Sequence, residues 1–232
     1  MIKVENIETW GFEHAIRGMR NPMNSWEKSD SYFDEFKGVI CTNDLILMRK
    51  LYAAGSEHRK YLRQIFVSMD IIAPLYWWKE FDTYKVGTVA NSCSTMHKIH
   101  AKEFTIDDFS CEHLIDNWDI PADEAPYNVE YEEYCNVPLE VLEFTIKALN
   151  VYRDVYIKTN DKKYWWQMIQ LLPSSYNQRR TVTMNYENVV NMIHQRKNHK
   201  LDEWRKFVEI LESLTYVKDI VYSTGNLPYQ WG

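Results

Sequence analysis

The chain has 232 residues, many aromatic side chains (16 Tyr and 9 Trp) and few Gly and Pro (7 of each), a balance that predicts a rigid, helix-rich globule. Its net charge of −6 argues against a nucleic-acid polymer as partner, because such binding needs a concentrated basic surface. Small anionic ligands remain compatible with this charge, since they need only local positive groups.

The first half of the chain is predicted to form two strands separated by short helices. In order, the segments are a strand over 2–10, a helix over 12–19, a loop over 19–42, a helix over 43–55, a helical turn leading into a strand over 56–74, and a helix over 74–81. Asn43 or Asp44 is expected to cap the second of these helices and Gly55 to stop it. Pro74 fits the first turn of the last one, where proline is tolerated.

The second half begins with the acidic, poorly periodic segment 99–136, which predicts an insertion of loops with a short helix. From Pro138 onward the apolar spacing is regular. The elements predicted there are a helix over 138–159, a helix over 161–173, a strand over 180–185, a helix over 186–197 and a helix over 200–214. Together these elements predict one α+β domain over residues 1–232, helix-rich with a small antiparallel sheet.

No apolar run reaches transmembrane length, and the first ten residues lack the apolar core of a signal peptide, so we expect a cytoplasmic protein without a membrane partner. The cysteines lack CxxC spacing and are expected to be reduced thiols. They are Cys41, Cys93, Cys111 and Cys135.

Motifs for metal, nucleophilic or phosphate-loop chemistry are weak. Cys93, His97 and His100 do not have a standard zinc spacing. Ser92 and Ser94 lack the sequence context of a catalytic serine, and no glycine-rich phosphate loop occurs. The pairs Trp77–Trp78 and Trp165–Trp166 are expected to fill the core, with stacking on a ligand ring as the less favoured alternative. Basic residues near the ends of predicted elements are candidate anion binders, namely Lys79, Lys85, Arg179 and Arg180.

The helix that follows Asn185 places Asn185 and Arg196 on one stripe, about three turns apart. Asn185 is then either a simple N-cap and Arg196 a solvated C-terminal cation, or the two residues flank a ligand. Spacing alone favours the first interpretation.

In their order, these segments resemble the flavin-dependent thymidylate synthase (ThyX) family. His58 stands where the family has a histidine, and Ala73–Pro74 supplies its Ala-Pro strand end. Lys79–Glu80 takes the place of its Arg-Gln pair. Thr83-Tyr84-Lys85 falls on the Arg-His-Arg triplet of the family signature, and Cys93 falls on its second serine.

The C-terminal half follows the family pattern of Leu-Pro, a strand, an Asn, and a helix that carries Asn and ends in Arg. The matching residues are Pro173, Asn185, Asn191 and Arg196. The chain also departs from the pattern, because family arginines are replaced and a guanidinium fork is not easily substituted. Thr83, Lys85, Thr95 and Ile169 stand in place of arginines, Tyr84 in place of the histidine and Asn91 in place of a glutamate.

The resemblance implies an FAD-dependent reductive methylation of dUMP, or a related transfer to C5 of a pyrimidine deoxynucleotide, with methylenetetrahydrofolate and NADPH as co-substrates. It implies Arg196 as the catalytic residue. The implied FAD contacts are His58, Lys85, Asn185 and Asn191, and the implied substrate contacts are Lys79, Glu80, Cys93 and Arg196. It further implies a homotetramer. The alternative is a non-catalytic homologue that binds a nucleotide or serves as an assembly subunit.

Overall fold

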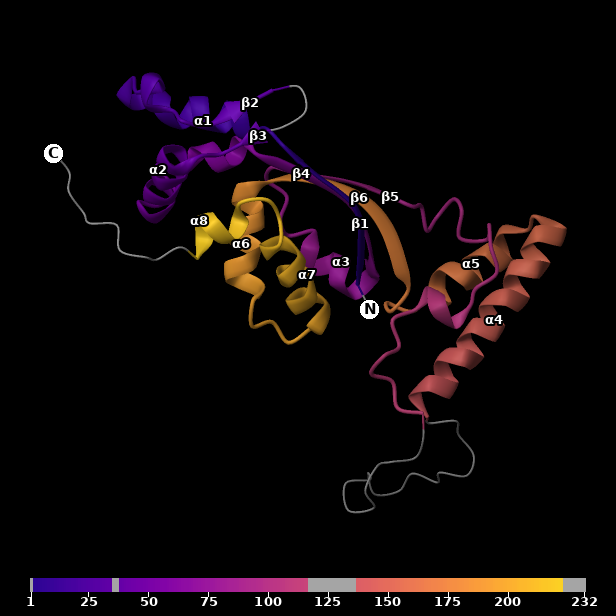
Figure 1. Ribbon diagram of the computed structural model, residues 1–232. Helices are drawn as coiled ribbons and strands as arrows, with labels where there is room; N and C mark the ends of the chain where they lie inside the picture. The colour runs from indigo at the N-terminus through magenta and orange to yellow at the C-terminus, as the bar shows by residue number, and fades with distance from the viewer. Residues whose placement is uncertain (1, 35–37, 117–136, 223–232) are drawn as a thin grey trace, which may run out of the picture. The chain divides into compact units, whose positions relative to one another are not determined.

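A computed structural model of the protein describes residues 2–34, 38–116 and 137–222 (Figure 1). Its strands are β1 (Lys3–Trp10), β2 (Tyr32–Phe33), β3 (Gly38–Val39), β4 (Phe66–Pro74), β5 (Thr88–Ser92) and β6 (Asn177–Asn185). Its α-helices are α1 (Phe12–Arg20), α2 (Thr42–Ala53), α3 (Leu75–Phe81), α4 (Pro138–Thr159), α5 (Lys162–Leu171), α6 (Tyr186–Arg196), α7 (Asp202–Glu212) and α8 (Val217–Val221). Short 3-10 helices are η1 (Asn21–Met23), η2 (Trp26–Lys28), η3 (Lys60–Gln64) and η4 (Ile106–Asp108). The predicted fold class, α+β and helix-rich with a small antiparallel sheet, is confirmed.

The main sheet has the strand order β1-β4-β6-β5. In the central strand β4, alternate side chains are buried, as expected of a strand with one face on the core. Thr181 and Thr183 of β6 hydrogen-bond to Asp70 (2.6 Å) and Ser68 (3.1 Å) of β4, so the two strands run in opposite directions. The edge strand β5 is exposed along most of its length.

Packing divides the chain into two compact units. The hairpin unit consists of Ile72–Glu80 and Ser92–Arg180, and the main unit consists of Ile2–Ile71, Phe81–Asn91 and Thr181–Gly232. The boundaries fall inside β4, β5 and β6, so each of these strands contributes residues to both units. The assignment of residues 1–232 to one domain stays a prediction.

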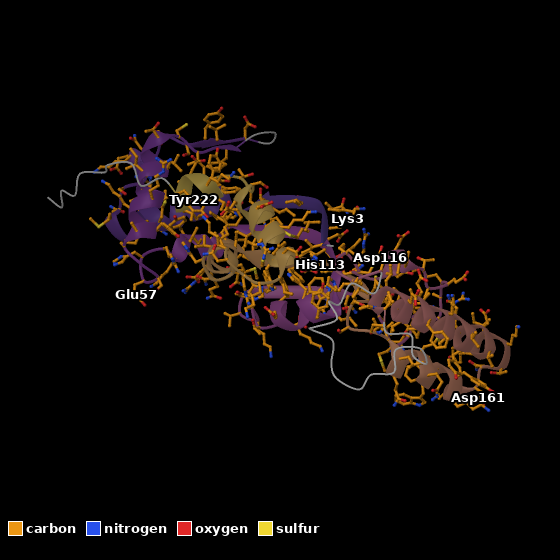
Figure 2. All side chains as sticks on the ribbon, turned by 90° about the horizontal axis from the view of Figure 1, so that it is seen from below. Lys3, Glu57, His113, Asp116, Asp161 and Tyr222 are labelled. Atoms are coloured by element: carbon orange, nitrogen blue, oxygen red, sulfur yellow. The ribbon has the colours of Figure 1, made fainter. Side chains whose placement is uncertain are left out.

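In the hairpin unit, α4 and α5 pack side by side on a core that includes Leu149 and Met168, both fully buried (Figure 1). Asp161, labelled in Figure 2, lies in the turn between these helices, and its Oδ1 accepts a hydrogen bond from the Lys163 amide at 3.0 Å. The N-terminus of α5 is therefore capped by the residue that precedes it.

The two tryptophan pairs differ. Trp77 and Trp78 are buried, as predicted, and the indole Nε1 of Trp78 donates to the Gln178 carbonyl at 3.0 Å. The prediction is wrong for Trp166, whose exposed fraction is 48%. Neighbouring positions on a helix point about 100° apart, so α5 turns only one ring of the second pair toward its core.

The main unit contains an ion pair that the sequence did not indicate. Asp44 is fully buried, and its Oδ1 accepts a hydrogen bond from Nε of buried Arg20 at 2.6 Å. Oδ2 accepts from the Ser29 hydroxyl (2.7 Å) and from the backbone amides of Asp30 (3.2 Å) and Ser31 (3.1 Å). One carboxylate thus joins α1, α2 and the connection between them.

The prediction that Asn43 or Asp44 caps α2 is wrong, because Asp44 lies within the helix and binds Arg20. The helix begins at Thr42, and Asp44 is turned inward to Arg20. The carboxylate of Asp30 accepts from the amides of Asn43 (2.8 Å) and Asp44 (3.2 Å) instead. A residue distant in sequence therefore satisfies the first-turn donors, a solution that local patterns do not reveal.

Six further elements were not predicted: the edge strand β5, the paired strands β2 and β3, the turns η1 and η2 within the expected loop, and α8. The insertion predicted at 99–136 contains η4 as its short helix, and its residues 117–136 lie outside the described ranges. Within the described ranges, no helix is both long and apolar enough to span a membrane. The described cysteines, at 41, 93 and 111, are free thiols.

Candidate functional site

The N-terminus of α6 fixes the loop that contains residues 86–88. Asn185 caps the helix, with its Oδ1 accepting from the Asn188 amide at 3.0 Å. The buried side chain of Asn188 donates to the carbonyl of Val86 (2.6 Å) and to the Thr88 hydroxyl (2.9 Å). The Asn185 amide donates to the Gly87 carbonyl at 3.3 Å. Two asparagines of one helix terminus therefore hold residues 86–88 in place.

Gly87 is required by this arrangement. Its φ of +73° lies in the left-handed region, and a Cβ there would come within 2.3 Å of Asn185 Nδ2. A side chain at residue 87 would thus be strained and would also push the capping asparagine away.

The C-terminus of α6 holds Arg196 against a group of aromatic rings. Its Nε donates to Tyr84 Oη at 3.0 Å, and its guanidinium carbon lies 4.8 Å from the ring centroid of Trp204 and 5.6 Å from that of Tyr84. Trp204 is fully buried and stacks on Phe81, with centroids 6.4 Å apart and planes at 17°. We call Phe81, Tyr84, Trp204 and Phe207 the aromatic platform; Phe207 packs edge-on to both Phe81 and Trp204.

The structure distinguishes the two interpretations of Asn185 and Arg196, as a simple cap and a solvated cation or as residues that flank a ligand. Asn185 is an N-cap, as the first interpretation held. Arg196 is not a solvated cation, because it is partly buried and bonded to Tyr84. The hydroxyl of Tyr84 also donates to Gln195 Oε1 at 2.8 Å, so the loop is bound at both ends of α6.

Around the middle of α6 lies a cluster that sequence reasoning missed. Nη2 of Arg59 donates to Asn191 Oδ1 at 3.3 Å, and its guanidinium lies 5.6 Å from the ring centroid of Tyr52. Arg59 Nε is buried without a hydrogen-bond acceptor among the described residues, and the Glu187 carboxylate is 3.9 Å away. Arg59 directly follows the predicted His58, but only the fold brings it to Asn191.

Tyr52 completes this cluster. Burial raises the pKa of Tyr52 although the Arg59 guanidinium opposes the shift, so its hydroxyl stays protonated at neutral pH. That hydroxyl lies 2.5 Å from His194 Nε2, and the two rings are stacked at a 14° angle. The cluster therefore ties α2 and η3 to the helix that carries Asn191 and Arg196.

The other predicted residues lie at the surface of their units. His58 is exposed in the turn before η3, beside Glu57, which Figure 2 labels. Lys85 is exposed and makes no ion pair with any described residue. In the main unit, Asn185, Asn191 and Arg196 lie along α6, and Lys85 lies in the loop whose neighbouring residues bond to α6. Lys79, Glu80 and Cys93, the substrate contacts that the resemblance implies, belong to the hairpin unit.

Cys93 and the basic residues near it are held by backbone pairing. The Cys93 amide donates to the Arg179 carbonyl at 2.9 Å, and its own carbonyl accepts from Gln178 Nε2 at 2.8 Å. The thiol is exposed. Arg180 stacks on Trp78, with its guanidinium 4.2 Å from a ring centroid, and bonds to Gln178 Oε1. In the described part of the chain, no group of three His, Cys, Asp or Glu side chains is placed to hold a metal ion.

Comparison with known proteins gives a likeness in fold. No family model and no curated protein sequence matches the chain. A crystal structure of Thymidylate Synthase X (ThyX) from Helicobacter pylori with FAD and dUMP matches with a TM-score of 0.63 at 14% identity, over 96% of this chain and 98% of that one. A second structure of ThyX from Helicobacter pylori, complexed with FAD and dUMP, matches with a TM-score of 0.62 at 14% identity, over 95% and 98%. Over nearly its whole length, then, the chain has the fold of these ThyX structures.

Proposed function

We propose that the protein is a ThyX-like flavoprotein that binds FAD and a pyrimidine deoxynucleotide and acts on C5 of the pyrimidine. The single observation that carries this proposal is the placement of Arg196 on the aromatic platform, at the end of the helix whose N-terminus holds the Lys85 loop. The likeness to structures holding FAD and dUMP supports the choice of ligands.

The residues along α6 fit an acceptor-rich, anionic cofactor. The buried Arg59 Nε has no hydrogen-bond acceptor among the described residues, and Lys85 is an exposed cation without an ion pair there. Asn191 accepts from Arg59 through its oxygen, which leaves its amide N–H groups as donors. Lys85 would bind a phosphate as a point charge, and His58, Asn185 and Asn191 would contact other parts of FAD.

When bound and reduced, FAD would supply a hydride. Arg196 would stabilise negative charge that develops on the pyrimidine, because a guanidinium held in place needs little reorganisation as that charge appears. Lys79, Glu80 and Cys93 would contact the nucleotide. Methylenetetrahydrofolate and NADPH are the proposed carbon and electron donors.

We expect FAD to raise the thermal unfolding temperature of the purified protein, whereas dUMP binds weakly or not at all. Thr83, Thr95 and Ile169 replace arginines, and each lost charge-assisted hydrogen bond weakens binding by about 1.5–3 kcal/mol. Thermal shift with FAD, followed by titration calorimetry of dUMP with FAD present, measures both. Absence of any FAD effect would reject the flavoprotein proposal, and micromolar dUMP affinity with folate-dependent dTMP formation would show that the substitutions are compensated.

The second candidate is a non-catalytic homologue that binds a nucleotide or serves in assembly. One observation favours it: Ile169 packs against the apolar core between α4 and α5, where a charged side chain would be unfavourable. Residue 169 therefore contributes to packing of the apolar core and supplies no positive charge. A protein that binds nucleotide without turning over dUMP and methylenetetrahydrofolate under reducing conditions would fit this candidate.

We also propose a homotetramer. Exposed apolar and aromatic side chains such as Phe144 (72%), Val151 (59%) and Trp166 (48%) support association, because aromatic residues are enriched at interfaces. Multi-angle light scattering at micromolar concentration is expected to give four times the mass of one chain. A monomeric mass would contradict the proposal.

A further inference from the structure

We propose that Tyr84 is a positioning residue that fixes the guanidinium of Arg196 for nucleotide recognition. This inference rests on the proposed function, since it concerns the same ligand. Tyr84 occupies the place where the resemblance puts a histidine, and its role here follows from its contacts in this chain.

The hydroxyl of Tyr84 is already engaged on both of its hydrogen-bonding sides. A phenol has one donor and two acceptor lone pairs. The donor is used by Gln195 Oε1 at 2.8 Å, and one lone pair is used by Arg196 Nε at 3.0 Å. Tyr84 therefore has no hydrogen-bond donor left for a ligand while these contacts persist, and both of its hydroxyl partners belong to the end of α6.

The same contacts constrain the arginine. An arginine side chain has many rotamers, and this rotamer entropy is lost when the side chain is fixed on a ligand. Here Nε is bound to Tyr84, and the guanidinium lies close to the rings of Trp204 and Tyr84, so much of that freedom is already lost before binding. Because the guanidinium is planar, fixing Nε also sets the direction in which both Nη groups point.

Tyr84 is itself held from two directions. Its amide donates to the Phe81 carbonyl at 3.0 Å, in the turn that ends α3. Its ring packs against Phe81 and Trp204, with centroids 6.5 Å and 6.0 Å away. The residues after it are anchored by Asn188. The hydroxyl is thus a fixed point against which Arg196 is oriented.

The test is the variant Tyr84→Phe, which keeps the ring and removes the hydroxyl. We expect the dissociation constant of dUMP, or of the pyrimidine deoxynucleotide that binds most tightly, to rise about tenfold when measured by calorimetry with FAD present, while that of FAD stays within twofold and the thermal unfolding temperature is nearly unchanged. Tyr216→Phe is the matched control. Its hydroxyl accepts a hydrogen bond from the Ile40 amide at 3.0 Å and its ring packs edge-on to Phe12, so its contacts do not involve Arg196 or Gln195, and we expect no change in either ligand.

A second measurement does not need a ligand. The Nε–H of Arg196, assigned in nitrogen-correlated NMR spectra by its loss in Arg196→Lys, should exchange slowly with water in the wild type and at least tenfold faster in Tyr84→Phe. Equal exchange in the two proteins would overturn the positioning role even if both bind dUMP. Parallel loss of FAD affinity, dUMP affinity and thermal stability would also overturn it and make Tyr84 a structural residue. If the wild type binds neither FAD nor any pyrimidine deoxynucleotide, the proposed function fails, and the exchange measurement still decides the role of Tyr84.

Discussion

Replacing Asp44 by alanine is expected to lower the free energy of unfolding by about 3–5 kcal/mol, because the buried Arg20 guanidinium would lose its counter-charge. The same change would leave the Ser29 hydroxyl and two backbone amides without their acceptor. Chemical denaturation followed by circular dichroism measures the difference. Asp219→Ala is the control in the same unit, since the Asp219 side chain is half-exposed in its pair with Arg49, and the pair is expected to contribute about 0–1 kcal/mol. A loss no larger than that of the control would contradict the assigned role.

The Asp44 network also predicts how stability depends on pH. Burial opposes ionisation, but hydrogen bonds from Ser31, Ser29 and Arg20 outweigh it and hold the pKa of Asp44 below its ordinary value. A carboxyl with a lowered folded-state pKa contributes stability above its unfolded pKa of about 3.9. This contribution is lost as the pH falls through the folded-state pKa. The stability difference between wild type and Asp44→Asn should therefore shrink below about pH 4, whereas a difference independent of pH would exclude linkage to this group.

Replacing Arg196 by alanine is expected to reduce nucleotide affinity by more than about 100-fold, because two charge-assisted hydrogen bonds of roughly 1.5–3 kcal/mol each are lost. The measurement is titration of dUMP, or of the nucleotide that binds most tightly, with FAD present. Unchanged affinity would show that Arg196 does not contact the nucleotide.

Stability separates this effect from unfolding. From its position near a helix end, Arg196 is expected to contribute only about 0.3–1 kcal/mol through the helix dipole. Its contacts with Trp204 and Tyr84 raise this expectation to roughly 1–2 kcal/mol, which leaves the fold intact. Arg196→Lys keeps the charge but not the planar fork, so it should recover stability better than affinity.

Regular apolar spacing was sufficient to predict the helices of the second half. The segments that became α4, α5, α6 and α7 were recognised because each repeats apolar residues at helical intervals, and Asn185 was recognised because an asparagine follows a strand and precedes such a helix. The strand β5 could not be predicted from the sequence. An exposed edge strand of small and polar residues has no buried face, so its sequence does not alternate between apolar and polar residues.

The contacts of the candidate site could not be predicted from the sequence, because their partners are far apart along the chain. Arg59 is hydrogen-bonded to Asn191, and Tyr84 to Arg196, and in each pair the partners are more than a hundred residues apart in sequence. Neither contact can be predicted from a local pattern in the sequence. The resemblance implies roles for Asn191 and Arg196, places Tyr84 in the signature without a role, and does not single out Arg59.

The hydrogen bond between the Cys93 amide and the Arg179 carbonyl has a consequence for folding order. Strand β5 ends at Ser92 and β6 begins at Asn177, so pairing the two strands requires a very long loop to close. The entropy cost of closure grows with loop length, and contacts of large sequence separation form late in folding. The α4–α5 hairpin is local and can fold first, and we expect β5 to join afterwards. Until then the edge of β6 is open, and an unpaired strand edge is a site for aggregation.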